Sequence, residues 1–259
     1  SVDGVVQEPS VAYAVSSGTT LTFTAAPSNN AGNNIFVYYL ASQVGTVGHP
    51  AAQNLSAGTG TFTGDVTIGD ASAADKKILF DGNAQDYHIG LDDSADVLVI
   101  GKGSALGTTT AMSFDANGTV TKPLQPAFSA RASIDNLALA TLITIPLSNE
   151  RFDVGSNLAS NTFTAPITGK YLFTYMLYFA NLDADHTSLD VHIKTSNTQY
   201  QQTFRPDHFF SADTNFSVSG SVLADMDLGD TCIFTTRVAG GANTSDIHTD
   251  SHVSGMLIC

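Results

Sequence analysis

The side chains best suited to chemistry in this 259-residue chain form an acidic and imidazole cluster late in the sequence. Asp183, Asp185 and Asp190 stand close together, accompanied by His186 and His192. Several carboxylate and carbonyl oxygens on one loop are the ligands that Ca²⁺ prefers, so the three aspartates are candidate metal ligands. The spacing is not that of an EF-hand, which needs a glycine at position six and a closing glutamate. The alternative, which the sequence favours, is a solvated loop between strands with no cofactor.

Two further pairings could support acid–base chemistry: Asp207 with His208, and Asp246 with His248. Neither is accompanied by a Gly-x-Ser-x-Gly nucleophile turn or an HExxH helix. Residues 101–107 come near the dinucleotide fingerprint, but they carry one residue too many before the last glycine. Two carboxylates spaced for glycoside cleavage could still meet in the fold. We nevertheless expect a protein that is not an enzyme.

Polar and aromatic side chains between the later predicted strands are better candidates for binding. Loops on a rigid β scaffold commonly carry binding sites, and the alternative is an ordinary connection that contacts another subunit. The binding candidates are Tyr200, Gln202, Arg205, Asp207, His208 and Asn243.

Strands must position these residues, because helix signals are nearly missing. Residues 20–24 alternate with period two, and 34–40 form a β-branched and aromatic run. Turn-forming residues at 27–32 separate the two, which predicts a small antiparallel β module over 1–42. Residues 43–60 are rich in Gly, Ala, Ser and Thr and are expected to form a linker.

Short strands punctuated by Gly, Asp and Asn fill residues 61–123. We predict them at 64–69, 77–82, 87–91, 97–101 and 112–115. A domain this small buries only about 60% of its surface, so we expect neighbouring chains to complete its core and form a β shaft. Pro123 and Pro126 mark a hinge, and a larger β domain, the head, is expected over 124–259.

The composition narrows the possible partners. Ten Lys and Arg stand against 24 Asp and Glu, for a net charge of −14, so no nucleic-acid partner is expected. No apolar run is long enough to span a membrane, and no insertion is expected. Cys232 and Cys259 are too few to staple the fold and are expected to be reduced, with a bridge between them as the alternative. The absence of an initiator Met suggests a longer parent chain.

A specific resemblance begins at residues 163–175, which read Phe, five residues, then Gly-x-Tyr-x-Phe-x-Tyr. This pattern resembles the signature of C1q-like domains, and 127–130, 228–230 and 251–258 continue the resemblance. It implies an all-β, ten-stranded jelly-roll head that forms a homotrimer. Heads of this family often bind Ca²⁺, although the three aspartates match no family ligand motif. The signature and core residues are Phe128, Phe163, Gly169, Tyr171, Phe173, Tyr175, Gly229, Asp230 and Gly255.

Two stretches earlier in the chain resemble segments of known fibre proteins. Residues 3–9, with Tyr13 and the strands that follow, resemble a small β repeat of tailed-phage fibre proteins. Residues 78–93, followed by 98–101, resemble the shaft of fibres from phages of marine bacteria. No Gly-X-Y period of a collagen stalk occurs.

Together the resemblances imply a bacteriophage tail fibre, which is part of the virion and is extracellular when mature. The N-terminal module would join an upstream fibre or tail protein, and the binding candidates would contact a glycan or protein receptor on the host cell. The alternative is a secreted, self-assembling adhesive or filament protein that uses a C1q-like unit for trimerisation.

Overall fold

The fold is described by a computed structural model that covers all residues except 18–19, 30–31, 33 and 38–57. Strands account for nearly all of its regular structure, and the helix found in the described part is the four-residue α1 (Pro206–Phe209). The predicted all-β class is therefore confirmed. The chain divides into two compact units, Ser1–Asp65 and Val66–Cys259. Among the described residues, no helix is long and apolar enough to cross a membrane.

The first unit contains the hairpin of β1 (Tyr13–Ser17) and β2 (Thr20–Phe23). The predicted strand at 34–40 is wrong where it can be seen, because Ile35 makes an isolated bridge with Val2 and no ladder continues from it. Residues 38–40 and most of the predicted linker at 43–60 lie outside the described residues.

The second unit begins with a five-stranded antiparallel sheet, which we call the shaft sheet. Its order along the sheet is β3 (Lys76–Phe80), β4 (Tyr87–Asp92), β5 (Val97–Lys102), β6 (Thr110–Phe114) and β7 (Val120–Thr121). Four of the predicted strands correspond to β3–β6. The strand predicted at 64–69 is wrong, because this segment pairs with no described strand and so lacks the ladder that would define it.

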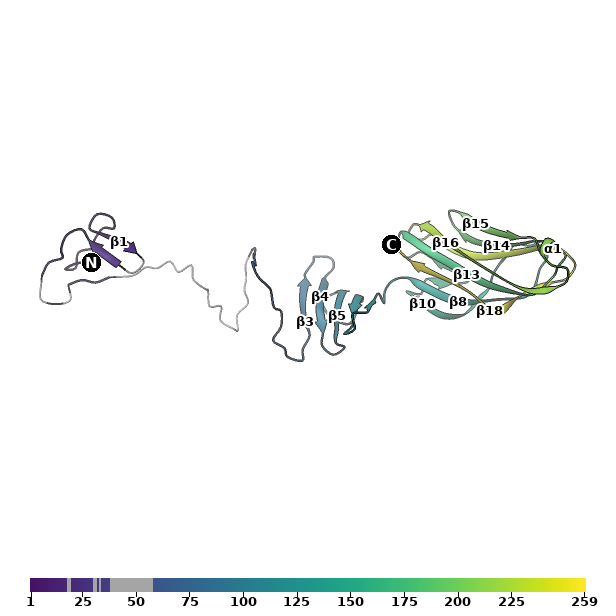
Figure 1. Cartoon of the computed structure of the whole chain (residues 1–259), viewed down its shortest axis with the longest axis horizontal. Coiled ribbons are helices and arrows are strands. Elements are labelled where there is room, and N and C mark those ends of the chain that lie inside the picture. The colour runs from purple at the N-terminus through teal and green to yellow at the C-terminus, as the bar shows by residue number, and fades with distance from the viewer. Residues whose placement is uncertain (18–19, 30–31, 33, 38–57) are drawn as a thin grey trace. The chain divides into compact units, whose positions relative to one another are not determined.

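The head is a sandwich of two antiparallel sheets, seen as two layers in Figure 1. The first sheet has the order β10 (Leu147–Val154), β8 (Ala127–Leu137), β18 (Ser245–Leu257), β13 (Gly169–Leu182) and β16 (Thr214–Met226). The second has the order β11 (Leu158–Ala159), β12 (Thr162–Thr164), β17 (Thr231–Gly240), β14 (His186–Thr195) and β15 (Gln199–Phe204). The short β9 (Ile143–Thr144) pairs with β17 outside this order. The ten main strands form the jelly roll that was predicted for the head.

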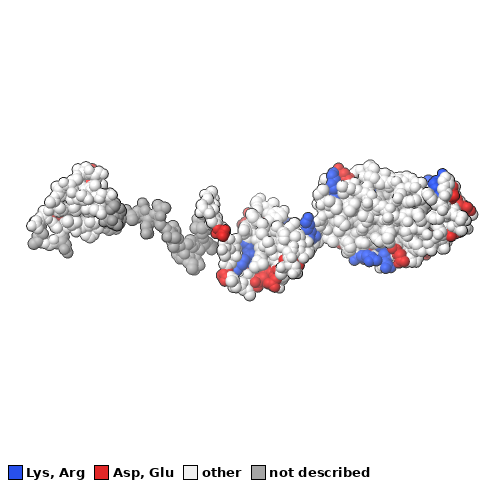
Figure 2. All heavy atoms as spheres, viewed as in Figure 1, with Lys and Arg blue, Asp and Glu red and all other residues white. Residues whose placement is uncertain are grey.

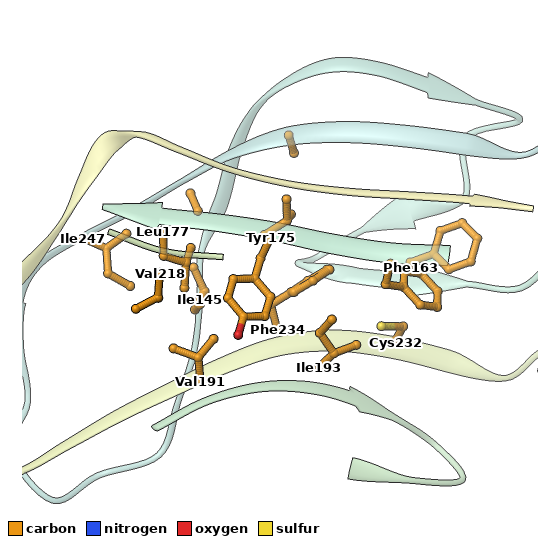
Figure 3. Close-up of a cluster of buried hydrophobic side chains, with 14 of the residues drawn as sticks. Ile145, Phe163, Tyr175, Leu177, Val191, Ile193, Val218, Cys232, Phe234 and Ile247 are labelled. Carbon is orange, nitrogen blue, oxygen red and sulfur yellow. The ribbon is translucent and has the colours of Figure 1, made fainter. Parts of the chain in front are cut away.

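Aromatic side chains fill the space between the two sheets of the head. Tyr171, Phe173 and Tyr175 alternate along β13, so all three point to its inner face. The Phe173 ring lies 5.6 Å from the Phe163 ring and 6.5 Å from the Phe234 ring, with edge-on geometry that aromatic pairs favour. Phe163 in turn stacks on Phe128 at 5.1 Å. Figure 3 shows side chains from both sheets meeting in this core.

Small residues close the head at two places. Gly229 has a φ of 89° in the turn before β17, and the Asp230 carboxylate accepts the backbone N–H of Asp227 there at 2.8 Å. Gly169 is the first residue of β13 and lies beside the backbone of Cys259.

Both cysteines are free: Cys232 is buried, which raises the pKa of its thiol, and Cys259 is exposed. The bridge between them is therefore not formed.

Gly255 on β18 leaves room for the aromatic core. A Cβ at this position would lie 2.5 Å from Cε1 of Phe128 and 2.7 Å from Cδ1 of Phe173. Gly255→Ala should therefore lower the free energy of unfolding by about 1–3 kcal/mol through overpacking, as measured by chemical denaturation. The control Gly64→Ala adds a methyl group where no heavy atom lies within 4 Å. Equal effects of the two substitutions would contradict this description of the core.

Candidate functional site

The head carries a pocket where its two sheets open along one side. The strands that border it, β15 and β16, are edge strands of opposite sheets. The pocket has a volume of about 260 Å³, and Val191, Ile193 and Val222 form its apolar part. Its polar and aromatic part consists of Tyr175, Tyr200, Gln201, Gln202 and Ser221, and Gly220 also lies against it. No charged side chain lines the pocket, so it suits an uncharged ligand.

Tyr175 reaches this pocket from the core. Figure 3 shows its hydroxyl directed toward the strand that carries Val191 and Ile193. The hydroxyl donates a hydrogen bond to Oε1 of Gln202 at 2.5 Å, and burial raises its pKa, so it stays protonated at neutral pH. The Gln202 amide nitrogen makes no hydrogen bond within the described part of the chain and is free to donate to a ligand.

Gly220, on the neighbouring strand β16 of the same sheet, leaves the space that the Tyr175 ring occupies. It pairs with Tyr175 between β13 and β16, and a Cβ on it would lie 2.7 Å from both Cζ and Oη of Tyr175. Any larger residue would push the tyrosine ring out of its place. The glycine in the middle of a strand is therefore explained by the close approach of a side chain.

Asp190 supports the strand that borders the pocket. Its carboxylate accepts hydrogen bonds from Oγ1 of Thr203 at 2.7 Å and from Nε2 of Gln201 at 3.2 Å. The Arg237 guanidinium lies 4.0 Å from it. Asp190 thus holds the side chains of Gln201 and Thr203, which lie on the same face of the sheet as Asp190.

Asp183 stabilises a loop at one end of the head by accepting hydrogen bonds from backbone N–H groups. The residue is 2% exposed, and its carboxylate oxygens accept hydrogen bonds from the backbone N–H groups of Asp185 at 2.9 Å, Ala242 at 3.0 Å and Asn243 at 2.8 Å. Burial acts to raise the pKa of this carboxyl, but the three N–H donors outweigh burial and leave the pKa below its ordinary value. Asn243, a binding candidate, is thereby held in the loop and also donates to Asp213 at 3.3 Å.

The three candidate metal ligands do not converge. Asp183 and Asp190 belong to the two separate hydrogen-bond networks just described, and Asp185 is exposed. Among the described residues, no group of three or more His, Cys, Asp or Glu side chains is arranged to hold a metal ion. The geometry gives the predicted shared calcium site no support, and calcium dependence stays an untested prediction. His186 and His192 are buried and bond to Gly240 and Thr235.

Arg205, Asp207 and His208 lie at α1, beyond the end of β15, and none of them lines the pocket. The guanidinium group of Arg205 donates two hydrogen bonds to the Asp207 carboxylate, from Nη2 at 2.9 Å and from Nε at 3.2 Å. This hydrogen bonding is the main cause that lowers the pKa of Asp207. His208 lies 3.7 Å from the same carboxylate. Phe209 is exposed, whereas Phe210 packs against Phe216.

The other acid–base pairing does not form. His248 lies 3.3 Å from the Asp250 carboxylate, and Asp246 instead accepts the backbone N–H of Asn136 at 2.7 Å. Of the six binding candidates, only Tyr200 and Gln202 line the pocket, whereas Arg205, Asp207 and His208 form a separate cluster at α1. The sequence patterns did not indicate the contribution of Tyr175 and Ser221 to the pocket; Gly220, a glycine inside a strand, was the available signal.

No known protein family matches the chain, and no curated protein is similar to it at a significant level. Solved structures are similar to 52% of the chain. They include the globular domain of zebrafish complement 1qA protein, with 18% identity, 98% of that chain covered and a TM-score of 0.40. Murine APRIL has 8% identity, 99% coverage and a TM-score of 0.37. Eiger TNF from S. frugiperda has 14% identity, 93% coverage and a TM-score of 0.37.

Asp183→Asn tests the role of the buried carboxylate in the loop. Weaker acceptance of three N–H groups should lower the free energy of unfolding by about 1–3 kcal/mol at neutral pH. Because the folded-state pKa lies below the unfolded value of about 3.9, this contribution is complete at neutral pH and is lost as the pH falls through the folded-state pKa. The difference between wild type and variant should therefore shrink in acid.

The matched control is Asp185→Asn, which changes an exposed carboxylate in the same turn. Denaturant titrations at about pH 7 and about pH 3 measure both variants. A loss that is equal for the two variants, or that does not shrink at the lower pH, would contradict the assigned role.

Proposed function

We propose that this chain is a subunit of a homotrimeric fibre of the kind carried by bacteriophage tails, and that its head binds a receptor on the host-cell surface without catalysis. The pocket at the open side of the head carries the proposal, because it offers a ligand site on a rigid sandwich rather than on a mobile loop. The resemblance of the first unit and the shaft sheet to phage fibre segments supports the rest.

The chemistry of the pocket favours a neutral sugar as its ligand. Tyrosine rings offer apolar faces to the C–H groups of a sugar, and glutamine amides and a serine hydroxyl can both donate and accept hydrogen bonds to its hydroxyls. The volume of about 260 Å³ lies just below the roughly 300 Å³ at which the usual range of ligand pockets begins. One sugar ring of a surface glycan is of suitable size.

Such a small site would bind weakly alone, and self-association would compensate for this. Three heads in one particle bind a repetitive surface with an effective concentration that raises avidity by about 10²–10⁴. Three chains also carry three times −14, or −42 charges, which keeps fibres from adhering to each other or to nucleic acid. Figure 2 shows how little of the visible surface is charged, which leaves recognition to neutral polar groups.

Tyr200→Ala tests the proposal at the pocket. Loss of the ring should reduce binding of the full chain to susceptible bacterial cells, or to their purified surface polysaccharide, at least about tenfold, because aromatic side chains dominate the free energy of such contacts. Gln199→Ala is the control, since Gln199 is an exposed residue of the same strand and does not line the pocket. Surface plasmon resonance on immobilised polysaccharide, together with cell-binding assays, gives the two affinities.

Equal binding by wild type and Tyr200→Ala would contradict receptor binding at this pocket. If the chain binds no bacterial surface and instead polymerises into filaments by itself, the proposal is wrong, and the self-assembling adhesive or filament protein takes its place.

A further inference from the structure

The shaft sheet has two faces of very different character. Residues paired directly across an antiparallel ladder point to the same face. The register aligns Ile78, Ile89, Ile100 and Met112 across β3–β6 in one row. The rows on either side, two residues away, belong to the same face, which we call the front face.

The front face is apolar and uncovered within the chain. Beside the central row lie Leu91, Leu98 and Val120 in one flanking row, and Phe80 and Tyr87 in the other. These side chains, with the three isoleucines, have exposed fractions between 37% and 53%. An apolar sheet face makes no favourable hydrogen bonds with water, and in antiparallel sheets such a face normally packs against a core.

The chain's own loop between β5 and β6 covers the middle of the back face, whereas Leu79 at the β3 edge of that face is 39% exposed. His88 and Val99 point to this face and are buried. Gly90 lies so close to the loop that a Cβ on it would be 2.9 Å from Cδ2 of Leu106. The chain therefore covers the centre of the back face, at β4 and β5, and leaves the front face without any such cover.

The area of the front face matches that of a stable protein interface. Its exposed apolar side chains amount to roughly 700 Å², against about 800 Å² per partner in a specific complex. A contiguous apolar patch of this size exceeds what monomeric proteins usually expose. Burying it would also supply the second layer that a small β segment needs for stability.

The charge pattern suits a second copy of the same face. The central row carries no charge, and the cations of the flanking rows, Lys76 and Lys102, lie at their ends. Lys76 is already paired with Asp70 at 3.1 Å. Identical faces can thus meet without burying an unpaired charge, which would be costly. An acidic chain of net charge −14 is by contrast poorly suited to an anionic lipid surface.

We infer that the front face of the shaft sheet is the contact between copies of this chain, with three sheets packed around a threefold axis so that their isoleucine rows meet. The inference rests on the proposed self-association and specifies the surface that performs it. Each copy supplies one wall of a shared apolar core, and β3 and β7 remain at its outer edges.

Thiol cross-linking of the full chain tests the inference. The background Cys259→Ser removes the exposed native thiol, and Cys232 is buried. Ile100→Cys then places a thiol on the front face, and Ile89→Cys provides a second position in the same row. The control Thr121→Cys lies on the back face, paired with Ser113. A short bifunctional maleimide is added under conditions dilute enough to prevent random collisions.

We expect covalent dimers from both front-face variants, in which up to two of every three chains are joined, and no cross-link from Thr121→Cys. Light scattering of the untreated protein should give about three times 27.0 kDa. A trimer that cross-links equally at both faces, or at neither, overturns the inference and leaves self-association standing. A mass of one chain in light scattering overturns both the front-face contact and the proposed self-association.

Discussion

An apolar face of a β-sheet must be covered, and this requirement shapes the second unit of the molecule. In the head the requirement is met within the chain, because the second sheet lies over the aromatic side chains of β13 and excludes water from them. The shaft sheet meets it on one face only, where the loop containing Leu106 packs. The two parts therefore differ: the head has a closed core that supports a rigid pocket, and the shaft sheet has an apolar face that is open within one chain.

The packed core of the head also creates the candidate site. Phe173 and Tyr171 fix the position of β13, and β13 in turn presents Tyr175 at the open side of the sandwich. Gly220 leaves room for the Tyr175 ring, and Oε1 of Gln202 accepts a hydrogen bond from the Tyr175 hydroxyl. A pocket built from core side chains is held rigid without loop ordering, so a ligand that bound there would cost little conformational entropy.

Local patterns in the sequence predicted the strands that carry strong alternation and the aromatic signature of the head. They failed where structure depends on partners: residues 64–69 have β propensity but no neighbouring strand, and the three aspartates are close in sequence but serve separate networks. The pocket could not be read from local spacing, because Tyr175, Tyr200 and Gly220 come from three strands whose proximity is set by sheet order. Local patterns did single out Tyr200 and Gln202 as binding candidates, and Gly220, a glycine inside a strand, was a further local signal.

The central claim is that copies of this chain cover the apolar face that one chain leaves open. A cryo-electron microscopy reconstruction of the assembled full chain tests it most directly. The account predicts a threefold particle in which Ile89 and Ile100 of each copy face the axis and contact their counterparts. A reconstruction in which the front face of the shaft sheet is open to solvent, or is covered by some other segment of the chain, would contradict it.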